Sequence, residues 1–163
     1  MRKKIFAIAV ALLTAVTASA QFEKNKVYVG GSLTGLNMNY SGASKFSIGV
    51  QAQGGYFIAD DFLLYGQAGY THSGHADDTF NVGAGARYYI EQNGIFLGAN
   101  CKYVRRGGDY DDVMPGVEVG YAFFVSHTVT VEPALYYEQS FKKHSDYSTF
   151  GLRIGVGVYL FKD

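Results

Sequence analysis

The chain has 163 residues, 48% of them hydrophobic, with 14 basic and 14 acidic side chains. Its 21 glycines, 14 tyrosines and 12 phenylalanines, beside only two prolines, exclude a helical bundle and argue against a disordered chain. The single cysteine excludes a disulfide scaffold or a zinc site built from cysteines, and the formal net charge of zero gives no basis for a nucleic-acid partner.

The N-terminus has the pattern of a cleavable secretory signal peptide. Basic residues at 2–4 precede an apolar run at 5–16, and Ala18-Ser19-Ala20 offers small side chains for cleavage before Gln21. The apolar run is shorter than the roughly 20 residues of a membrane-spanning helix, and no later segment is long and apolar enough to be one. We therefore expect a signal peptide at 1–20 and one domain at 21–163.

Alternation of apolar with polar or small residues dominates this domain. From Phe150 to Leu160, every second residue is apolar, and the positions between hold mostly glycine and arginine. This period of two predicts β-strands and fits no helix. Turn-type residues separate eight such strands, at 27–38, 45–58, 62–72, 79–90, 95–105, 113–125, 128–141 and 149–161. Tight and longer connections alternate, and we expect local bulges at Pro115 and Pro133, which lack a backbone donor.

The two faces of these strands separate a membrane barrel from a soluble one. One face carries no charge over the roughly 9–11 residues that a strand needs to cross a bilayer. The other holds Gly, Ser, Gln and Asn with six charges, which we expect to form a lumen network: Arg87, Lys102, Glu118, Glu132, Glu138 and Arg153. Eight strands enclose an interior that side chains just fill, and glycine there makes room for long charged groups. The pattern predicts an all-β, eight-stranded antiparallel up-and-down transmembrane β-barrel.

Aromatic residues gather toward the strand ends. Near the tight turns stand Phe62, Tyr88, Phe96, Phe123, Phe124 and Tyr159, and near the longer loops stand Tyr70, Phe80, Tyr103, Tyr137, Phe141 and Phe150. Although aromatic residues favour strands in general, their bias toward strand ends predicts the two aromatic girdles of an outer-membrane barrel.

With its signal peptide, its eight glycine- and aromatic-rich strands and a last strand reading Leu-Arg-Ile-Gly-Val-Gly-Val-Tyr-Leu-Phe, the chain resembles the small eight-stranded outer-membrane barrels. These are the OmpA/OmpX-like families, and particularly the outer-membrane β-barrel domain proteins of Bacteroidota. The resemblance implies export through the periplasm to the bacterial outer membrane. It also implies outer-membrane lipid, lipopolysaccharide and the barrel assembly machinery as partners.

Two interpretations of the lumen network stay open. Its three positive and three negative charges fit a gated ion path or proton relay, and they also fit a structural plug of salt bridges, which the narrow bore favours. Loop centres estimated from the sequence place Glu138 directly opposite Arg153 and Lys102 directly opposite Glu118. Arg87 and Glu132 are then left to meet across the bore.

Polar residues near the longer loops suggest three further sites. A basic rim of Arg105, Arg106, Lys142 and Lys143 suits lipopolysaccharide phosphates, unless Asp109, Asp111 and Asp112 neutralise it. Histidines and aspartates that include His72, His75, Asp77, Asp78, His144 and Asp146 have no spacing that fixes a metal site, and we expect no metal and no cofactor. The pairs His72-Ser73 and His144-Ser145 have no acidic residue placed to orient the histidine, so we expect no enzyme.

We therefore expect a non-enzymatic integral outer-membrane barrel with a lumen filled by side chains. Its function would be envelope integrity or surface interaction through short extracellular loops. The alternatives are a narrow, porin-like channel and a lipid-modifying enzyme of the outer membrane.

Overall fold

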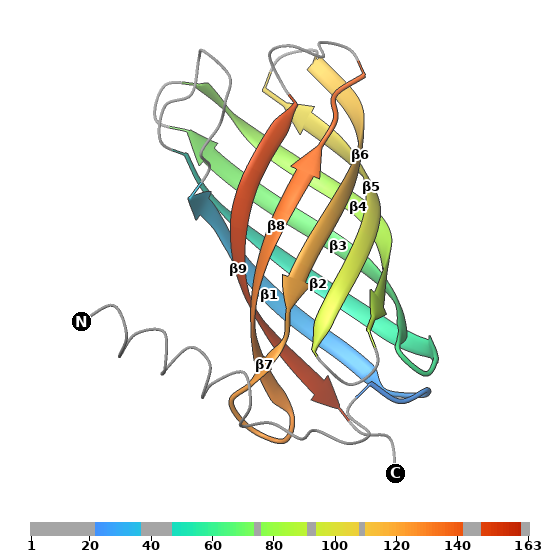
Figure 1. Cartoon of the computed structure of the whole chain (residues 1–163). Coiled ribbons are helices and arrows are strands. Elements are labelled where there is room, and N and C mark those ends of the chain that lie inside the picture. Colours follow the sequence, from blue (N-terminus) through green and yellow to red (C-terminus); the bar gives the residue numbers. More distant parts are fainter. Residues whose placement is uncertain are drawn as a thin grey trace, which may run out of the picture.

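The computed structural model describes residues 22–36, 47–73, 76–90, 94–107, 110–141 and 148–160. The expected signal peptide lies outside these ranges. All regular secondary structure within them is β-strand (Figure 1). The strands are β1 (Val27–Leu36), β2 (Ser47–Ala59), β3 (Phe62–Ser73), β4 (Ala76–Tyr89), β5 (Ile95–Arg106), β6 (Tyr110–Tyr121), β7 (Phe123–Phe124), β8 (Val129–Glu138) and β9 (Thr149–Leu160).

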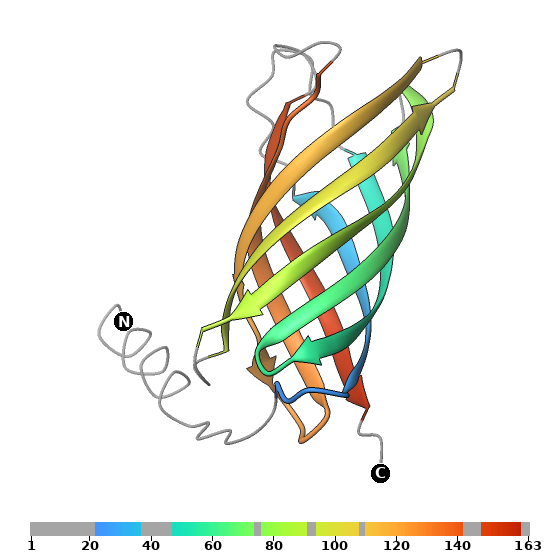
Figure 2. The ribbon, with the colours of Figure 1, turned by 90° about the vertical axis from the view of Figure 1, so that its right-hand side faces the viewer.

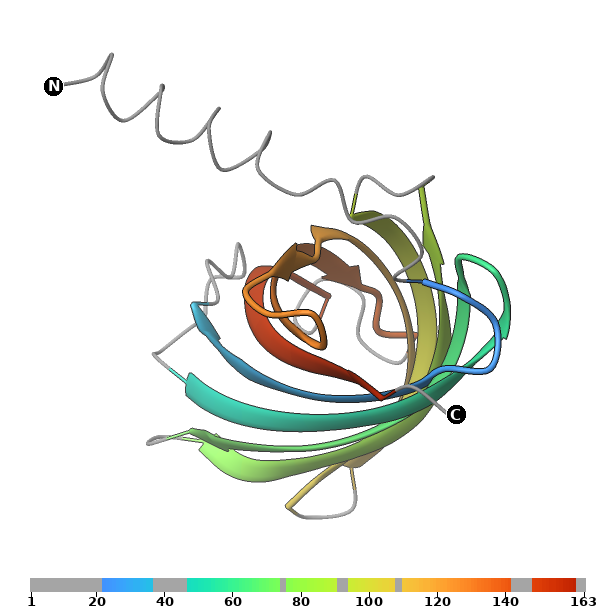
Figure 3. The same ribbon diagram turned by 90° about the horizontal axis from the view of Figure 1, so that it is seen from below.

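The strands form one antiparallel sheet that closes on itself. Consecutive strands pair from β1 to β6, β9 pairs with β1 and β8, and β6 pairs with β8. The two-residue β7 continues β6 along β8, so the nine segments form an eight-stranded barrel. Figure 2 shows the barrel from the side. Seen along the barrel, the strands surround a common interior (Figure 3). The predicted eight-stranded antiparallel barrel is confirmed.

Two of the predicted loops are too long. β4 and β6 begin at Ala76 and Tyr110, three residues earlier than expected for each strand. In the β5–β6 hairpin, Arg105 pairs in register with Asp111, and this opposite-charge cross-strand pair favours continuing the ladder. The sequence analysis treated the aspartates here as turn residues because of their general preference for turns.

The predicted bulges at the two prolines are wrong. Pro115 pairs in register with Cys101, and Pro133 with Ile154, without any shift. Shifts of register occur near strand ends instead, between Thr34 and Leu36, between Phe57 and Ala59, and between Thr71 and Ser73. Proline therefore removes hydrogen-bond donors from this barrel without shifting the register of these ladders.

Burial alternates along each strand, with the apolar set facing outward. Leu33 is 66% exposed, Val50 59% and Val117 56%. Exposing a continuous apolar surface of this extent to water is unfavourable, whereas the acyl chains of a bilayer can surround it. Among the described residues, no helix is long and apolar enough to cross a membrane.

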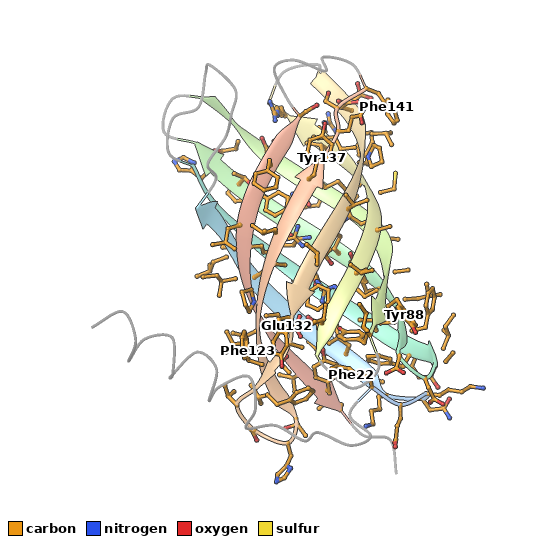
Figure 4. All side chains as sticks on the ribbon, in the orientation of Figure 1. Phe22, Tyr88, Phe123, Glu132, Tyr137 and Phe141 are labelled. Carbon is orange, nitrogen blue, oxygen red and sulfur yellow. The ribbon has the colours of Figure 1, made fainter. Side chains whose placement is uncertain are left out.

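The two predicted aromatic girdles are confirmed at one end and corrected at the other. All six aromatic residues near the longer loops are exposed on the outer face, among them Tyr137 and Phe141 (Figure 4). At the tight-turn end, Tyr88 faces outward, but Phe96 and Tyr159 are buried inside the barrel and Phe124 packs against the aromatic cluster there. All three share the parity of the lumen-facing residues, so the alternation along the chain decides their face, whatever their distance from the strand end.

The outward orientation of β9 gives a first prediction. Val156→Lys places a charge among acyl chains and should lower the free energy of unfolding by about 2–4 kcal/mol. Urea titration in lipid vesicles, read by heat-modifiable gel mobility, measures this loss. Gly155→Ala is the matched control, because its added Cβ faces the lumen and meets no atom closer than 3.5 Å. Equal stability of the two variants would mean that β9 is assigned to the wrong face.

Candidate functional site

The structure places all six residues of the predicted lumen network on the inner wall. Arg87 comes from β4, Lys102 from β5, Glu118 from β6, Glu132 and Glu138 from β8, and Arg153 from β9. Five are buried, with 2–5% exposure, and Lys102 is half-buried. The charges therefore come from the part of the wall between β4 and β9, and none of the six comes from β1, β2 or β3.

Arg87 lies at the centre of the network. Its Nε donates to Glu118 Oε1 at 2.6 Å and its Nη1 donates to Glu132 Oε2 at 3.0 Å. Its Nη2 donates to Gln53 Oε1 at 3.0 Å, and the guanidinium lies 4.6 Å from the ring centroid of Phe96. The expected meeting of Arg87 with Glu132 across the bore is thus present.

The network continues from Glu118 toward the loop end. Arg153 Nη1 donates to Glu118 Oε2 at 3.0 Å, and Arg153 Nη2 lies 3.8 Å from Glu138 Oε1. Lys102 Nζ in turn donates to Glu138 Oε2 at 2.5 Å. Every charge has an opposite charge within 4 Å, the condition that makes buried ions tolerable.

The register predicted for two of these contacts is wrong. Glu138 stands opposite Thr149 rather than Arg153, and Lys102 stands opposite Met114 rather than Glu118. Both hairpins are offset by four residues from the expectation. An even offset keeps every side chain on its predicted face, and long side chains then reach partners that are not directly opposite.

Glycines on the inner wall make room for the carboxylates. A Cβ on Gly98 would come within 2.6 Å of Glu118 Cγ, and a Cβ on Gly157 would come within 2.5 Å of Glu132 Oε1. Neither position accommodates a larger residue while the network keeps its geometry. The glycine-rich lumen face is therefore a packing requirement of the charges.

A hydrogen-bonded cradle holds Glu132 at the tight-turn end of the network. Its Oε2 accepts from Tyr28 at 2.8 Å, and its Oε1 accepts from Thr130 at 2.7 Å and from Tyr159 at 2.9 Å. The Tyr159 hydroxyl also lies 3.0 Å from that of Tyr89. The sequence analysis did not single out Tyr28, although it shares the parity of the polar set on its strand.

Below the cradle, an aromatic cluster fills the tight-turn end of the lumen. Phe22 is 3% exposed and stacks on Tyr89 with ring centroids 4.0 Å apart. It also packs against Phe57, Phe124 and Tyr159. Backbone bonds from Asp61 N to Phe22 O and from Asn25 N to Phe57 O tie this N-terminal segment across the barrel end. Phe22 precedes the first strand, so alternation carries no signal for it.

The predicted basic rim is divided between the two faces. Arg105 is exposed on the outer face, whereas Arg106 follows the lumen parity and is half-buried. Lys142 and Lys143 lie outside the described residues. Of the aspartates expected to neutralise the rim, Asp111 pairs in register with Arg105, Asp112 is buried and accepts a hydrogen bond from Ser140, and Asp109 is not described.

One loop-end contact differs from the sequence analysis. His72 Nδ1 lies 2.6 Å from Asp78 Oδ1, so an acidic residue does orient this histidine. Tyr70 donates to the other Asp78 oxygen at 2.5 Å, and the bonds from Tyr70 and His72 hold the pKa of Asp78 below its usual range. Within the described residues, no three potential metal ligands cluster. His75, His144 and Asp146 are not described.

Comparisons with known proteins give the fold a context. No protein-family model and no curated protein matches the chain. The N-terminal β-barrel domain of Pseudomonas aeruginosa OprF matches with a TM-score of 0.66 and 15% identity, over 84% of this chain and 98% of that one. Neisserial surface protein A matches with a TM-score of 0.59 and 20% identity, over 82% of this chain and 95% of that one. The attachment invasion locus protein Ail of Yersinia pestis matches with a TM-score of 0.55 and 13% identity, over 84% of this chain and 99% of that one. This chain therefore shares the fold of small outer-membrane barrels.

The shared carboxylate Glu118 gives a second prediction. Glu118→Gln removes the carboxylate that Arg87 and Arg153 share and leaves the buried network with one uncompensated positive charge. The variant should lower the free energy of unfolding by about 3–5 kcal/mol. Adding Arg153→Met restores neutrality, so the double variant should be more stable than Glu118→Gln alone. Urea titration in vesicles measures both variants.

Asp60→Asn is the control, because Asp60 is an exposed carboxylate outside the network, and the amide keeps an oxygen that can accept from Lys24 N. A double variant that loses the sum of the two single losses would mean that the charges do not act as one network.

Proposed function

We propose that this chain is an integral protein of the bacterial outer membrane, that its barrel is closed to ions, and that it acts through its loop-end surface. The observation that carries the proposal is the double block in the lumen. Arg87, held by two carboxylates and 2% exposed, occupies the lumen above the aromatic cluster around Phe22, which fills the tight-turn end. Narrow eight-stranded barrels leave little space around such side chains.

The orientation follows from the chain ends and the turns. Val27 of β1 pairs with Leu160 of β9 at the tight-turn end, so both ends of the barrel domain lie there. A signal-directed protein that inserts from the periplasm keeps this end periplasmic and sends its longer loops outward. The barrel assembly machinery is the partner for that insertion, and a rigid closed barrel suits a role in envelope integrity or in surface interaction.

Electrical recording tests the closed barrel and yields a third prediction. We expect the purified protein in planar bilayers to pass no steady ion current, and Phe22→Ala to be equally silent because the Arg87 contacts still occupy the bore. Discrete, reproducible steps in the wild type would favour the channel instead. Steps in Phe22→Ala alone would assign the barrier to the aromatic cluster and overturn the blocking role of the charges.

The rim supports a contact with lipopolysaccharide. Arg105 lies on the outer face beside Phe80, its cross-strand neighbour, and aromatic girdles of this kind stand at the membrane interfaces of outer-membrane barrels. A guanidinium binds phosphate with paired hydrogen bonds. The opposing Asp111 reduces the local positive charge, so a single exposed arginine gives a weak contact.

A fourth prediction tests that contact. Arg105→Ala should weaken binding of purified lipopolysaccharide to the nanodisc-embedded protein by about two- to fivefold, since exposed ion pairs contribute about 1 kcal/mol or less. Arg106→Ala is the control and should leave the affinity unchanged, because Arg106 has lumen parity. Equal loss in both variants would remove Arg105 from the lipid contact.

The pair formed by His72 and Asp78 is the one observation that favours a lipid-modifying enzyme. Serine hydrolysis also needs a hydroxyl bonded to the other nitrogen of the histidine, and the described residues provide none. The His72 side chain is 70% exposed, so solvent screens its electrostatic interaction with the Asp78 carboxylate. Mass spectrometry of lipid A with and without the protein separates the two functions: a mass change that His72→Ala abolishes would replace the non-enzymatic proposal.

A further inference from the structure

Both prolines of the chain remove a hydrogen-bond donor from the same seam of the barrel, the one between β6 and β8. Gln139 N donates to Pro115 O at 2.9 Å, so the backbone of Pro115 is directed at β8. Val129 O accepts from Val125 N at 2.9 Å, on the β7 side of β8. Alternate residues of a strand face the same neighbour, so Pro133, four residues after Val129, is directed at the continuation of β6.

The ladder of this seam is interrupted where Pro133 stands. Pairing between β6 and β8 runs from Gly116–Glu138 to Gly120–Ala134 and resumes only at Phe123–Val131 of β7. By contrast, the β5–β6 ladder continues without a break from Ile95–Tyr121 to Arg106–Tyr110.

The break cannot be repaired by a change of register. The same register holds on both sides of it, and Pro133 stands where a donor for Tyr121 is needed. On the inner face of the break, Ala122 and Ala134 are small and buried, and the longer side chain of Glu132 is buried beside them.

We infer that the β6–β8 seam is a built-in lateral opening point, where the barrel wall separates locally while the other seams stay closed. Its position is distinctive, because the seam between the first and last strands, β1 and β9, is paired from Val27–Leu160 to Leu36–Leu152 with one shift of register. The opening would connect the bilayer with the apolar end of the lumen around Ala122 and Phe96.

Amide hydrogen exchange of the wild-type protein in lipid nanodiscs, resolved by NMR, tests this inference directly. The amides that face across the seam, those of Val117, Val119, Leu135 and Tyr137 by ladder alternation, should exchange about tenfold faster than amides across β1–β9 and β2–β3, as expected for the loss of one or two hydrogen bonds. Uniform protection, or fastest exchange across β1–β9, would overturn the inference whether or not any variant folds.

Restoring the donors provides the converse test. Pro115→Val with Pro133→Val returns two N–H groups to the seam and keeps both outward side chains apolar, so exchange there should slow by about tenfold. Leu135→Val is the control, since it changes an apolar side chain in the same seam and keeps its N–H. A double variant that exchanges as fast as this control would assign any mobility of the seam to side-chain packing and refute the role of the prolines.

Discussion

This structure depends on one constraint, which is that the hydrocarbon core of a bilayer contains no water to form hydrogen bonds with the backbone. Each N–H and C=O inside the bilayer must find a partner in the protein, and a sheet achieves this only by closing. Closure fixes the alternation of faces, and alternation sends every second side chain into a bore too narrow for disordered water. The charges, the glycines and the buried tyrosines of the interior are all consequences of that arrangement.

Within the bore, electrostatics and packing impose one solution together. Arg87 forms its ion pairs with Glu118 and Glu132 only because there is space for both carboxylates. Gly98 and Gly157 provide that space, since a Cβ at either position would overlap a carboxylate side chain. The cradle of tyrosines around Glu132 supplies donors that water would otherwise give. The interior therefore stabilises the fold through the hydrogen bonds that its buried ions make, since burying an ion pair alone gives little net gain.

The faces of the strands could be predicted from the sequence, whereas the register could not. A period of two assigns Arg153 to the lumen whatever its partner, because an even slip leaves every residue on its face. The register depends on where a hairpin turns, and the aspartates near Tyr110 resembled a loop although their strand continues through them. Direct cross-strand pairing was also a poor guide to contact, because Lys102 of β5 reaches Glu138 of β8. Phe22 lies before the pattern begins, so only the folded chain reveals its place.

The interior network and the weak seam are related through Arg87. Its guanidinium, on β4, binds Glu118 of β6 and Glu132 of β8, one on each side of the seam that lacks ladder donors. Arg153 of β9 adds a second link, since it lies near both Glu118 and Glu138. Side-chain bonds across the bore thus hold together two strands that their own backbones hold poorly. The salt bridges that block the bore therefore also oppose separation of β6 from β8, so the seam opens only when these bridges break.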